Sequence, residues 1–226
     1  MVNQQELSKK AVGEKATEFI KDGMTIGLGS GSTIYWTLKK LGEIIQQGMK
    51  VKGIPSSKRT EGLAHEFNIP LTTWADVQRL DLAIDGANEV DQHLNLIKGG
   101  GGSLVREKMV NIHADQLIIV ADESKLVSEL GNFPLPVEVL PFGWEVTTSH
   151  ISQLGAIPKL RMNGQEIFIS DNGNYILDCQ FNTISDPKSL HKELKLLTGV
   201  VETGLFIDMA DIVILSGDSE IRMLSR

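Results

Sequence analysis

Met24-Thr-Ile-Gly-Leu-Gly-Ser-Gly-Ser-Thr33 decides the fold, and a helical pattern follows it with apolar residues at Leu38, Leu41, Ile44 and Ile45. The first five residues of the quoted stretch predict a short buried strand, and the last five predict a loop of glycines and hydroxyl residues. Strand, loop and helix in this order are typical of an α/β protein.

A helix that begins directly after such a loop offers unpaired N–H groups and a partial positive charge, which favours phosphate binding. A P-loop would need a lysine after Gly31, and a dinucleotide fingerprint would need a glycine where Ser32 stands. The loop therefore predicts a site for one small phosphate, held by Ser30, Gly31, Ser32 and Thr33. A plain turn with a Ser or Thr helix cap remains an alternative.

The same alternation of strands and helices continues along the chain and predicts a mostly parallel sheet. Strands are expected at 50–54, 69–72, 80–84 and 116–121, with helices at 4–21, 58–67 and 103–113. Ligands of such sheets bind at the carboxyl ends of the strands. The loops Gly29–Thr33, Asp85–Asn88 and Asp122–Lys125 each follow a predicted strand, so we expect them at one edge of the sheet.

A run of four glycines lies in Lys98-Gly-Gly-Gly-Gly-Ser-Leu-Val-Arg-Glu-Lys108. Glycines of this kind occur where the backbone bends sharply or approaches a ligand. Together with the ammonium of Lys98 and the carboxylate of Glu107, the run suits an anionic substrate that loses a proton. A flexible hairpin loop is the alternative. For the acidic residues Asp85, Glu89 and Asp91, hydrogen bonds to a polyhydroxy substrate are favoured over a solvated turn or a weak metal site.

The second half of the chain predicts a small α+β domain. The prolines of 133–141 indicate a connection, which helices at 144–154 and 190–197 follow, with strands at 156–161, 166–170, 175–180 and 199–206. The strand 211–215 is expected to return to the first sheet. We expect domain boundaries of 1–130 plus 207–226 for the larger domain and 131–206 for the smaller one.

Composition excludes several classes of function. A net charge of -7 over 226 residues argues against nucleic-acid binding, and no apolar run is long enough to span a membrane. Cys179 is the only cysteine, so no internal disulfide and no thiolate-rich zinc site is expected, and the histidines show no metal-ligand spacing. Without a secretory signal at its start, the protein is expected to be cytoplasmic.

Five motifs in order carry a resemblance to a known family. They are Gly27-Leu-Gly-Ser-Gly-Ser-Thr33, Asp85-Gly-Ala-Asn-Glu89, the glycine-run segment Lys98–Lys108, Ala121-Asp-Glu-Ser-Lys125 and Phe133-Pro-Leu-Pro-Val-Glu138. With these, the chain resembles the ribose-5-phosphate isomerases of type A from its first helix to its last strand. The resemblance implies a Rossmann-like, mostly parallel sheet domain and a smaller ferredoxin-like α+β domain.

The family interconverts D-ribose 5-phosphate and D-ribulose 5-phosphate through an enediolate, in the non-oxidative pentose phosphate pathway. The resemblance implies a homodimer or homotetramer that uses no metal and no cofactor. It also implies that Glu107 is the catalytic base, with Asp85 and Lys98 assisting. The substrate contacts that it implies are Ser30, Gly31, Ser32, Thr33, Asp85, Gly86, Ala87, Asn88, Lys98, Gly99, Gly100, Gly101 and Lys125.

Two positions depart from the family pattern. Ser30 replaces the usual threonine and keeps the hydroxyl, whereas Asn88 replaces the usual aspartate and cannot titrate, though it can still orient a hydroxyl group. Two other functions stay open at this point: a sugar-phosphate sensor without activity, and an acyl or CoA transferase-like enzyme with Glu107 as its nucleophile.

Overall fold

The computed structural model describes residues 4–217 and 220–226. The chain forms two compact units, each built from separate segments of sequence. The first unit contains the residues up to Ala87, Arg106–Leu126 and the residues from Met209 onward. The second unit contains Asn88–Val105 and Val127–Asp208.

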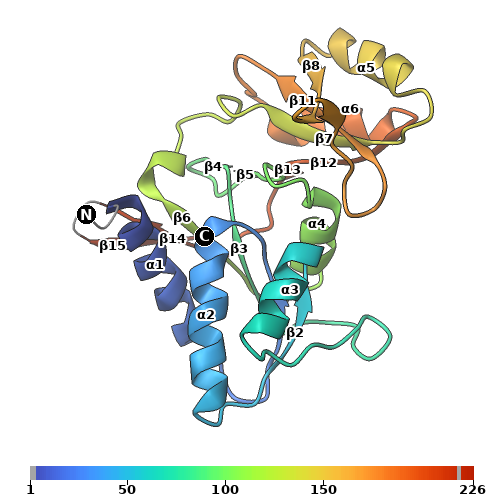
Figure 1. Ribbon diagram of the computed structural model, residues 1–226. Coiled ribbons are helices and arrows are strands. Elements are labelled where there is room, and N and C mark those ends of the chain that lie inside the picture. The colour runs from blue at the N-terminus through green and yellow to red at the C-terminus, as the bar shows by residue number, and fades with distance from the viewer. Residues whose placement is uncertain (1–3, 218–219) are drawn as a thin grey trace. The chain divides into compact units, whose positions relative to one another are not determined.

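A six-stranded sheet forms the centre of the first unit (Figure 1). Its strand order is β15-β14-β6-β3-β1-β2. Its strands are β1 (Thr25–Leu28), β2 (Lys52–Pro55), β3 (Leu82–Gly86), β6 (Leu117–Asp122), β14 (Ile212–Ser216) and β15 (Ile221–Ser225). All neighbouring strands are parallel except β14 and β15, which are antiparallel. The predicted parallel sheet and the return of the chain to it after residue 211 are confirmed.

Helices cover both faces of this sheet. They are α1 (Gln4–Ala16), the short 3-10 helix η1 (Thr17–Phe19), α2 (Ser32–Gln46), α3 (Lys58–Glu66), α4 (Leu104–Ile112) and the 3-10 helix η2 (Glu123–Lys125). Alternate residues of β1 point to opposite faces. Ile26 and Leu28 therefore join the core formed with α1 and α2, whereas a side chain at Gly27 would meet Val110 of α4 on the other face.

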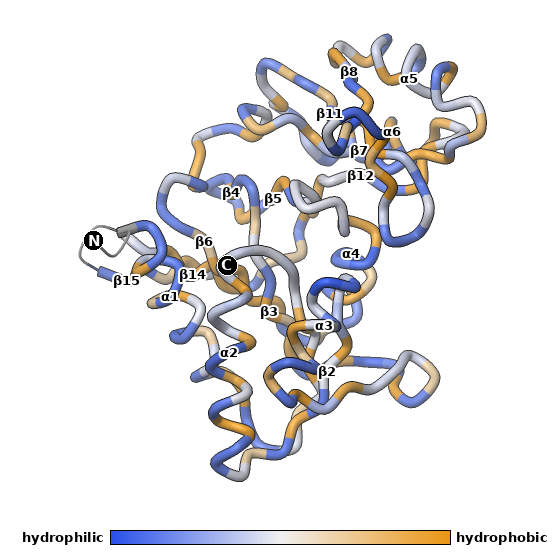
Figure 2. Tube along the Cα trace, in the orientation of Figure 1, coloured by the Kyte–Doolittle hydropathy of each residue, from blue (hydrophilic) through white to orange (hydrophobic). Residues whose placement is uncertain are grey.

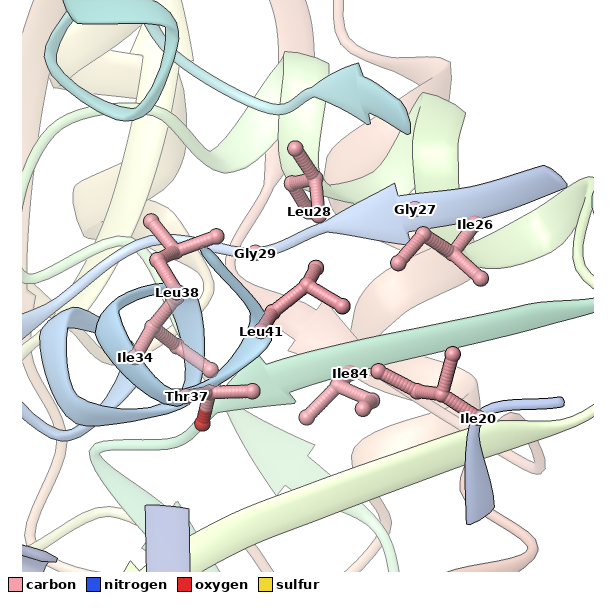
Figure 3. A pocket seen from close by; sticks show the side chains of 10 residues that line it. All are labelled: Ile20, Ile26, Gly27, Leu28, Gly29, Ile34, Thr37, Leu38, Leu41 and Ile84. Carbon is pink, nitrogen blue, oxygen red and sulfur yellow. The ribbon is translucent and has the colours of Figure 1, made fainter. Parts of the chain in front are cut away.

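Helix α2 packs its apolar stripe onto the strands directly behind the glycine and serine loop. Hydrophobic and hydrophilic residues alternate along the helix (Figure 2), and Ile34, Leu38 and Leu41 are buried. These side chains and those of β1 and β3 enclose a cavity of about 10 Å³ (Figure 3). That volume is roughly the space of one water molecule, so this hollow belongs to the core and is far too small for a sugar phosphate.

The second unit contains a four-stranded antiparallel sheet with the order β12-β7-β11-β8. Its elements, in chain order, are β7 (Leu135–Val139), α5 (Trp144–Gln153), β8 (Ile157–Leu160), β11 (Tyr175–Gln180), α6 (Pro187–Leu196) and β12 (Val200–Thr203). This βαββαβ order is that of a ferredoxin-like unit. The fold class expected from the sequence is therefore confirmed.

Short strands complete the second unit. They are β4 (Glu89–Val90), β5 (Leu96–Ile97) and β13 (Leu205–Phe206), which form one small sheet, and the paired strands β9 (Met162–Asn163) and β10 (Glu166–Ile167). Because β5 pairs with both β4 and β13, the residues 88–105 belong to the second unit. The domain boundaries expected from the sequence placed residues 88–105 in the first unit instead. Those boundaries also included residues 1–3 and 218–219, which lie outside the described residues.

The structure corrects the prediction that 133–141 is only a connection. Leu135–Val139 is β7, an inner strand of the second sheet, and Leu135, Val137 and Val139 are fully buried. The prolines concealed the strand, since proline is rare in inner strands. Pro136 has no N–H group to donate, but its carbonyl accepts a hydrogen bond from the N–H of Gly204. The predicted strand at 69–72 is reduced to one bridge, between Gly53 and Leu71.

None of the helices within the described residues is long and apolar enough to cross a membrane.

Candidate active site

The carboxylate of Asp85 is held by hydrogen bonds to both of its oxygens. It lies at the end of β3 and is fully buried. Its Oδ1 accepts hydrogen bonds from the N–H groups of Ser30 (3.0 Å) and Gly86 (2.8 Å), and its Oδ2 accepts one from Asn111 Nδ2 (2.9 Å). The two predicted loops 29–33 and 85–88 are thus joined through one carboxylate, since β1 and β3 are parallel neighbours.

Gly29 allows this close approach. A Cβ atom at position 29 would lie 2.4 Å from Asp85 Oδ1 and 2.5 Å from Asp85 Cα, distances that real Cβ atoms do not adopt. The glycine is therefore required by the contact between the two strand ends. Glycine is needed here because no side chain fits, and not because of the backbone conformation, since the φ angle of Gly29 is not positive.

The hydroxyl of Ser30 has protein partners. Its Oγ lies 2.9 Å from the hydroxyls of Ser56 and Ser57 and 3.1 Å from that of Thr60, and Thr60 Oγ1 donates to the carbonyl of Gly29 (2.8 Å). Ser57 also caps α3, since its Oγ accepts the N–H of Thr60. This hydroxyl cluster fixes the loop after β1 to the start of α3.

The residues at the start of α2 are more exposed to solvent than the hydroxyl residues that surround Ser30. Gly31 is the N-cap with a φ of 115°, a left-handed value that favours glycine, and it is exposed together with Ser32. Thr33 is half-buried. The first N–H groups of α2 begin here, at the place where the sequence predicts an anion site.

Glu107 lies in the first turn of α4 and is buried. Asn111 follows it by four residues, so both side chains lie on the same face of the helix. Because Asn111 donates to Asp85 Oδ2, α4 brings Glu107 within one helical turn of the residue that holds Asp85. The spacing Glu-x-x-x-Asn was visible in the sequence, but the role of Asn111 was missed.

Lys125 is the last residue of η2, directly after β6, and is half-buried. β6 is the parallel neighbour of β3, with Gly86 paired to Val120. The loops after β1, β3 and β6 therefore lie at one edge of the first sheet, as predicted.

Ala87 belongs to the first unit, whereas the remaining predicted residues, Asn88 and 98–101, belong to the second. Lys98 is only 2% exposed; its N–H donates to the carbonyl of Gly204 (2.9 Å), and its Nζ lies 5.4 Å from the ring centre of Phe206. Gly99 has a φ of 96°, and the N–H of Gly100 donates to Asn88 Oδ1 (2.9 Å). The amide that departs from the family pattern thus acts as an acceptor that fixes the glycine run.

The other two acidic residues of this loop, Glu89 and Asp91, accept hydrogen bonds from backbone N–H groups. Glu89 accepts hydrogen bonds from the N–H groups of Gly131 (2.8 Å) and Phe133 (2.6 Å). Asp91 accepts those of His93 and Asn95 (2.8 Å each). Within the described ranges, no group of three or more His, Cys, Asp or Glu residues has an arrangement suited to a metal ion.

Two larger hollows in the first unit lie away from these residues. One, of about 370 Å³, is lined near the amino ends of β1 and β2 by Met24, Lys52 and Pro70, among others. The other, of about 690 Å³, lies beside α1 and α2. Neither contains a predicted site residue. Hydrogen-bond geometry therefore identifies the site better than the size of a hollow.

Known proteins resemble this chain over most of its length. The family model of ribose 5-phosphate isomerase A (phosphoriboisomerase A) matches residues 52–220. Ribose-5-phosphate isomerase A 1 from Oceanobacillus iheyensis is 55% identical over 214 residues, which cover 94% of this chain and 96% of the relative. Ribose-5-phosphate isomerase A from Bacillus mycoides is 54% identical over 202 residues, 89% of this chain and 91% of the relative.

Solved structures match over the whole chain. A D-ribose-5-phosphate isomerase in complex with phospho-erythronic acid is 40% identical, with a TM-score of 0.95 and 100% of both chains covered. The ribose 5-phosphate isomerase A of Methanocaldococcus jannaschii is 39% identical, with a TM-score of 0.94 and coverage of 99% of this chain and 100% of that one. The chain therefore belongs to the ribose 5-phosphate isomerase A family, whose activity is the interconversion of ribose 5-phosphate and ribulose 5-phosphate.

Proposed function

We propose that the chain carries out this isomerisation with Glu107 as the base that moves the proton. The observation that carries the proposal is the position of Glu107, buried in the first turn of α4 and one turn before the asparagine that holds Asp85. A buried carboxylate next to a fixed polar group is a suitable general base, because general-base catalysis depends first on geometry.

The chemistry assigns the other groups. Converting the aldose to the ketose removes the proton at C2, forms an enediolate and adds a proton at C1. One carboxylate can perform both transfers when it reaches both carbons. We assign to Asp85 the movement of protons between O1 and O2, and to the ammonium of Lys98 the stabilisation of the developing negative charge.

We assign the phosphate of the substrate to the start of α2 and to Lys125. Gly31 and Ser32 are exposed at the helix N-terminus, where N–H groups and the helix dipole attract anions. Lys125 follows β6 at the same edge of the sheet. Binding the phosphate there would position the reacting carbons. The complex of a relative with phospho-erythronic acid, a phosphorylated sugar acid, supports a substrate of this class.

Glu107→Gln tests the proposal, because it keeps the shape of the side chain and removes its basic oxygen. We expect kcat to fall at least ~10³-fold with KM changed only a few-fold, since general-base catalysis is typically worth ~10²–10⁴. Glu61→Gln is the matched control: Glu61 also lies in the first turn of a helix, α3, but is exposed. Its activity should equal that of the wild type.

Isotope exchange sharpens the same test. The wild type should exchange the C1 proton of ribulose 5-phosphate with D₂O, and Glu107→Gln should not. Exchange by the variant at nearly the wild-type rate would assign the base to another residue, first of all Asp85. A Glu107-linked acyl intermediate would instead support the transferase alternative.

We also propose that the chain forms a homo-oligomer, a dimer or a tetramer. Leu140, Phe142 and Val146 are exposed apolar residues in the segment where β7 leads into α5, and Phe142 is 94% exposed. Apolar groups of this kind on a protein surface often mark association sites. Light scattering after gel filtration should give a mass above that of one chain, and Phe142→Asp should lower it. An unchanged mass would exclude this surface.

A further inference from the structure

The carbonyl groups of the glycine run are bound by an arginine that the sequence did not single out. Arg161 Nη1 donates to the carbonyl of Gly99 (2.9 Å) and to that of Gly100 (3.2 Å). All of these residues belong to the second unit. One side chain thus binds two successive peptide groups of a segment assigned to the substrate.

Arg161 is itself rigidly held. Its Nε donates to Asp178 Oδ2 (2.9 Å) and its Nη2 to Asp178 Oδ1, which gives a two-pronged ion pair. Its Cζ lies 5.7 Å from the ring centre of Phe168. Its backbone N–H donates to the carbonyl of Ile176 (2.8 Å), and its backbone carbonyl accepts the N–H of Phe168 (2.9 Å). The planar guanidinium of arginine can bind a carboxylate with two hydrogen bonds and stack on an aromatic ring at the same time. The ammonium of a lysine could not replace it here.

Phe168 also fits the glycine run directly. A Cβ atom at Gly102 would lie 2.4 Å from Phe168 Cζ, so the ring occupies the space that the glycine leaves. Gly102 has a φ of 85°, and its N–H donates to the carbonyl of Gly99 (3.0 Å). The tight turn of the run therefore rests on Arg161 and Phe168.

Binding the carbonyls determines where the N–H groups point. In a trans peptide the C=O of one residue and the N–H of the next point in opposite directions. Because the Gly99 carbonyl accepts a hydrogen bond from Arg161, the N–H of Gly100 points away from the arginine. That N–H donates to Asn88 Oδ1. With the Gly100 carbonyl on Arg161, the N–H of Gly101 also points away from the arginine. Gly101 is exposed, and its N–H has no acceptor within the described parts of the chain.

We propose that Arg161 is a positioning residue of the isomerase, which orients the peptide groups of the glycine run so that the N–H of Gly101 donates to a substrate oxygen. The inference rests on the proposed function of the run. An N–H held in place before the reaction stabilises an oxygen on which negative charge develops, because no reorganisation is needed when the charge appears. The contribution therefore belongs to the transition state more than to binding.

Three substitutions in the full chain test this role. Arg161→Ala should lower kcat ~10²-fold, the usual effect of misplacing a reacting group by about 1 Å, with KM for ribose 5-phosphate changed less than ~3-fold. Arg161→Lys should lose ~10-fold or more, because an ammonium cannot bind two carbonyls and a carboxylate in the fork geometry. Lys188→Ala is the control: it removes an exposed ion pair of the same unit, with Asp208, and should leave kcat unchanged.

Chemical rescue separates positioning from general destabilisation. Millimolar guanidinium should restore the kcat of Arg161→Ala ~10-fold or more, since the ion can enter the space left beside Asp178. The same salt should not rescue Glu107→Gln. If Arg161→Ala does not fold, Arg161→Lys supplies the comparison of kcat with KM.

Two results would overturn the inference. One is an Arg161→Ala or Arg161→Lys kcat within twofold of the wild type. The other is a loss that appears in KM alone and does not respond to guanidinium. If the wild type and Lys188→Ala fail to isomerise ribose 5-phosphate, the proposed function fails instead.

Discussion

Replacing Gly29 with alanine tests the contact between the ends of β1 and β3. The added Cβ would lie 2.5 Å from Asp85 Cα, whereas ordinary contact begins at 3.4 Å. The difference, 3.4 minus 2.5, requires a shift of about 0.9 Å. The atom in the way belongs to the backbone of β3, so no side-chain rotation can relieve the overlap.

The shift has two calculable effects. Overpacking of this kind typically costs ~1–3 kcal/mol of the free energy of unfolding. It would also lengthen the 3.0 Å hydrogen bond from the N–H of Ser30 to Asp85 Oδ1 beyond bonding distance. Because misplacing a catalytic group by about 1 Å costs ~10²-fold, we expect kcat for ribulose 5-phosphate formation to fall by that factor while the protein remains folded.

Gly62→Ala is the matched control. Gly62 lies within α3, and no heavy atom lies within 4 Å of its added Cβ. Alanine is a better helix former than glycine, so this variant should be more stable by ~0.5–1 kcal/mol and fully active. Urea unfolding and initial rates should be measured for both variants. A Gly29→Ala enzyme with kcat within threefold of the wild type and unchanged unfolding would refute the steric argument.

Three further predictions concern single residues. Lys125→Ala should raise KM for ribose 5-phosphate and leave the weak reaction of unphosphorylated ribose nearly unchanged; equal losses for both sugars would show that Lys125 does not bind the phosphate. Asn88→Asp should stay within ~10-fold of wild-type activity, about 1.4 kcal/mol in the barrier, because a carboxylate can still accept the N–H of Gly100; a large gain at neutral pH would contradict a purely orienting role. Burial, aided by the Asp178 carboxylate, raises the pKa of the Cys179 thiol, so a thiol reagent at neutral pH should label the native protein slowly and the urea-unfolded protein fast; rapid native labelling would contradict this.

The sequence predicted the first unit well because its inner strands are continuous apolar runs. Leu117–Ala121 is buried on both faces, as parallel strands between helices are. The second unit was harder. Pro136 lies within an inner strand, and β4, β5 and β13 are two residues long, which is too short for any period to appear.

The candidate site also has a part that the sequence predicted and a part that it did not. Local sequence identified the loops, because glycine and hydroxyl residues after a strand indicate a ligand. Contacts between distant segments could not be predicted: the Ser30 hydroxyl meets Ser56 and Thr60, and Arg161 meets Gly99, 62 residues away. Only Asn111 could have been found, from its helical spacing to Glu107.

The strand order of the first sheet has a consequence for synthesis of the chain. β6 pairs with β14, which comes more than 90 residues later. Until 212–216 leaves the ribosome, β6 is an edge strand with the sequence Leu117-Ile-Ile-Val-Ala121, and open apolar edges invite pairing between chains. Contacts between such distant segments also form slowly. We therefore expect nascent chains that stop before β14 to aggregate and to bind chaperones, although all of the predicted site residues, the last of which is Lys125, have already been made.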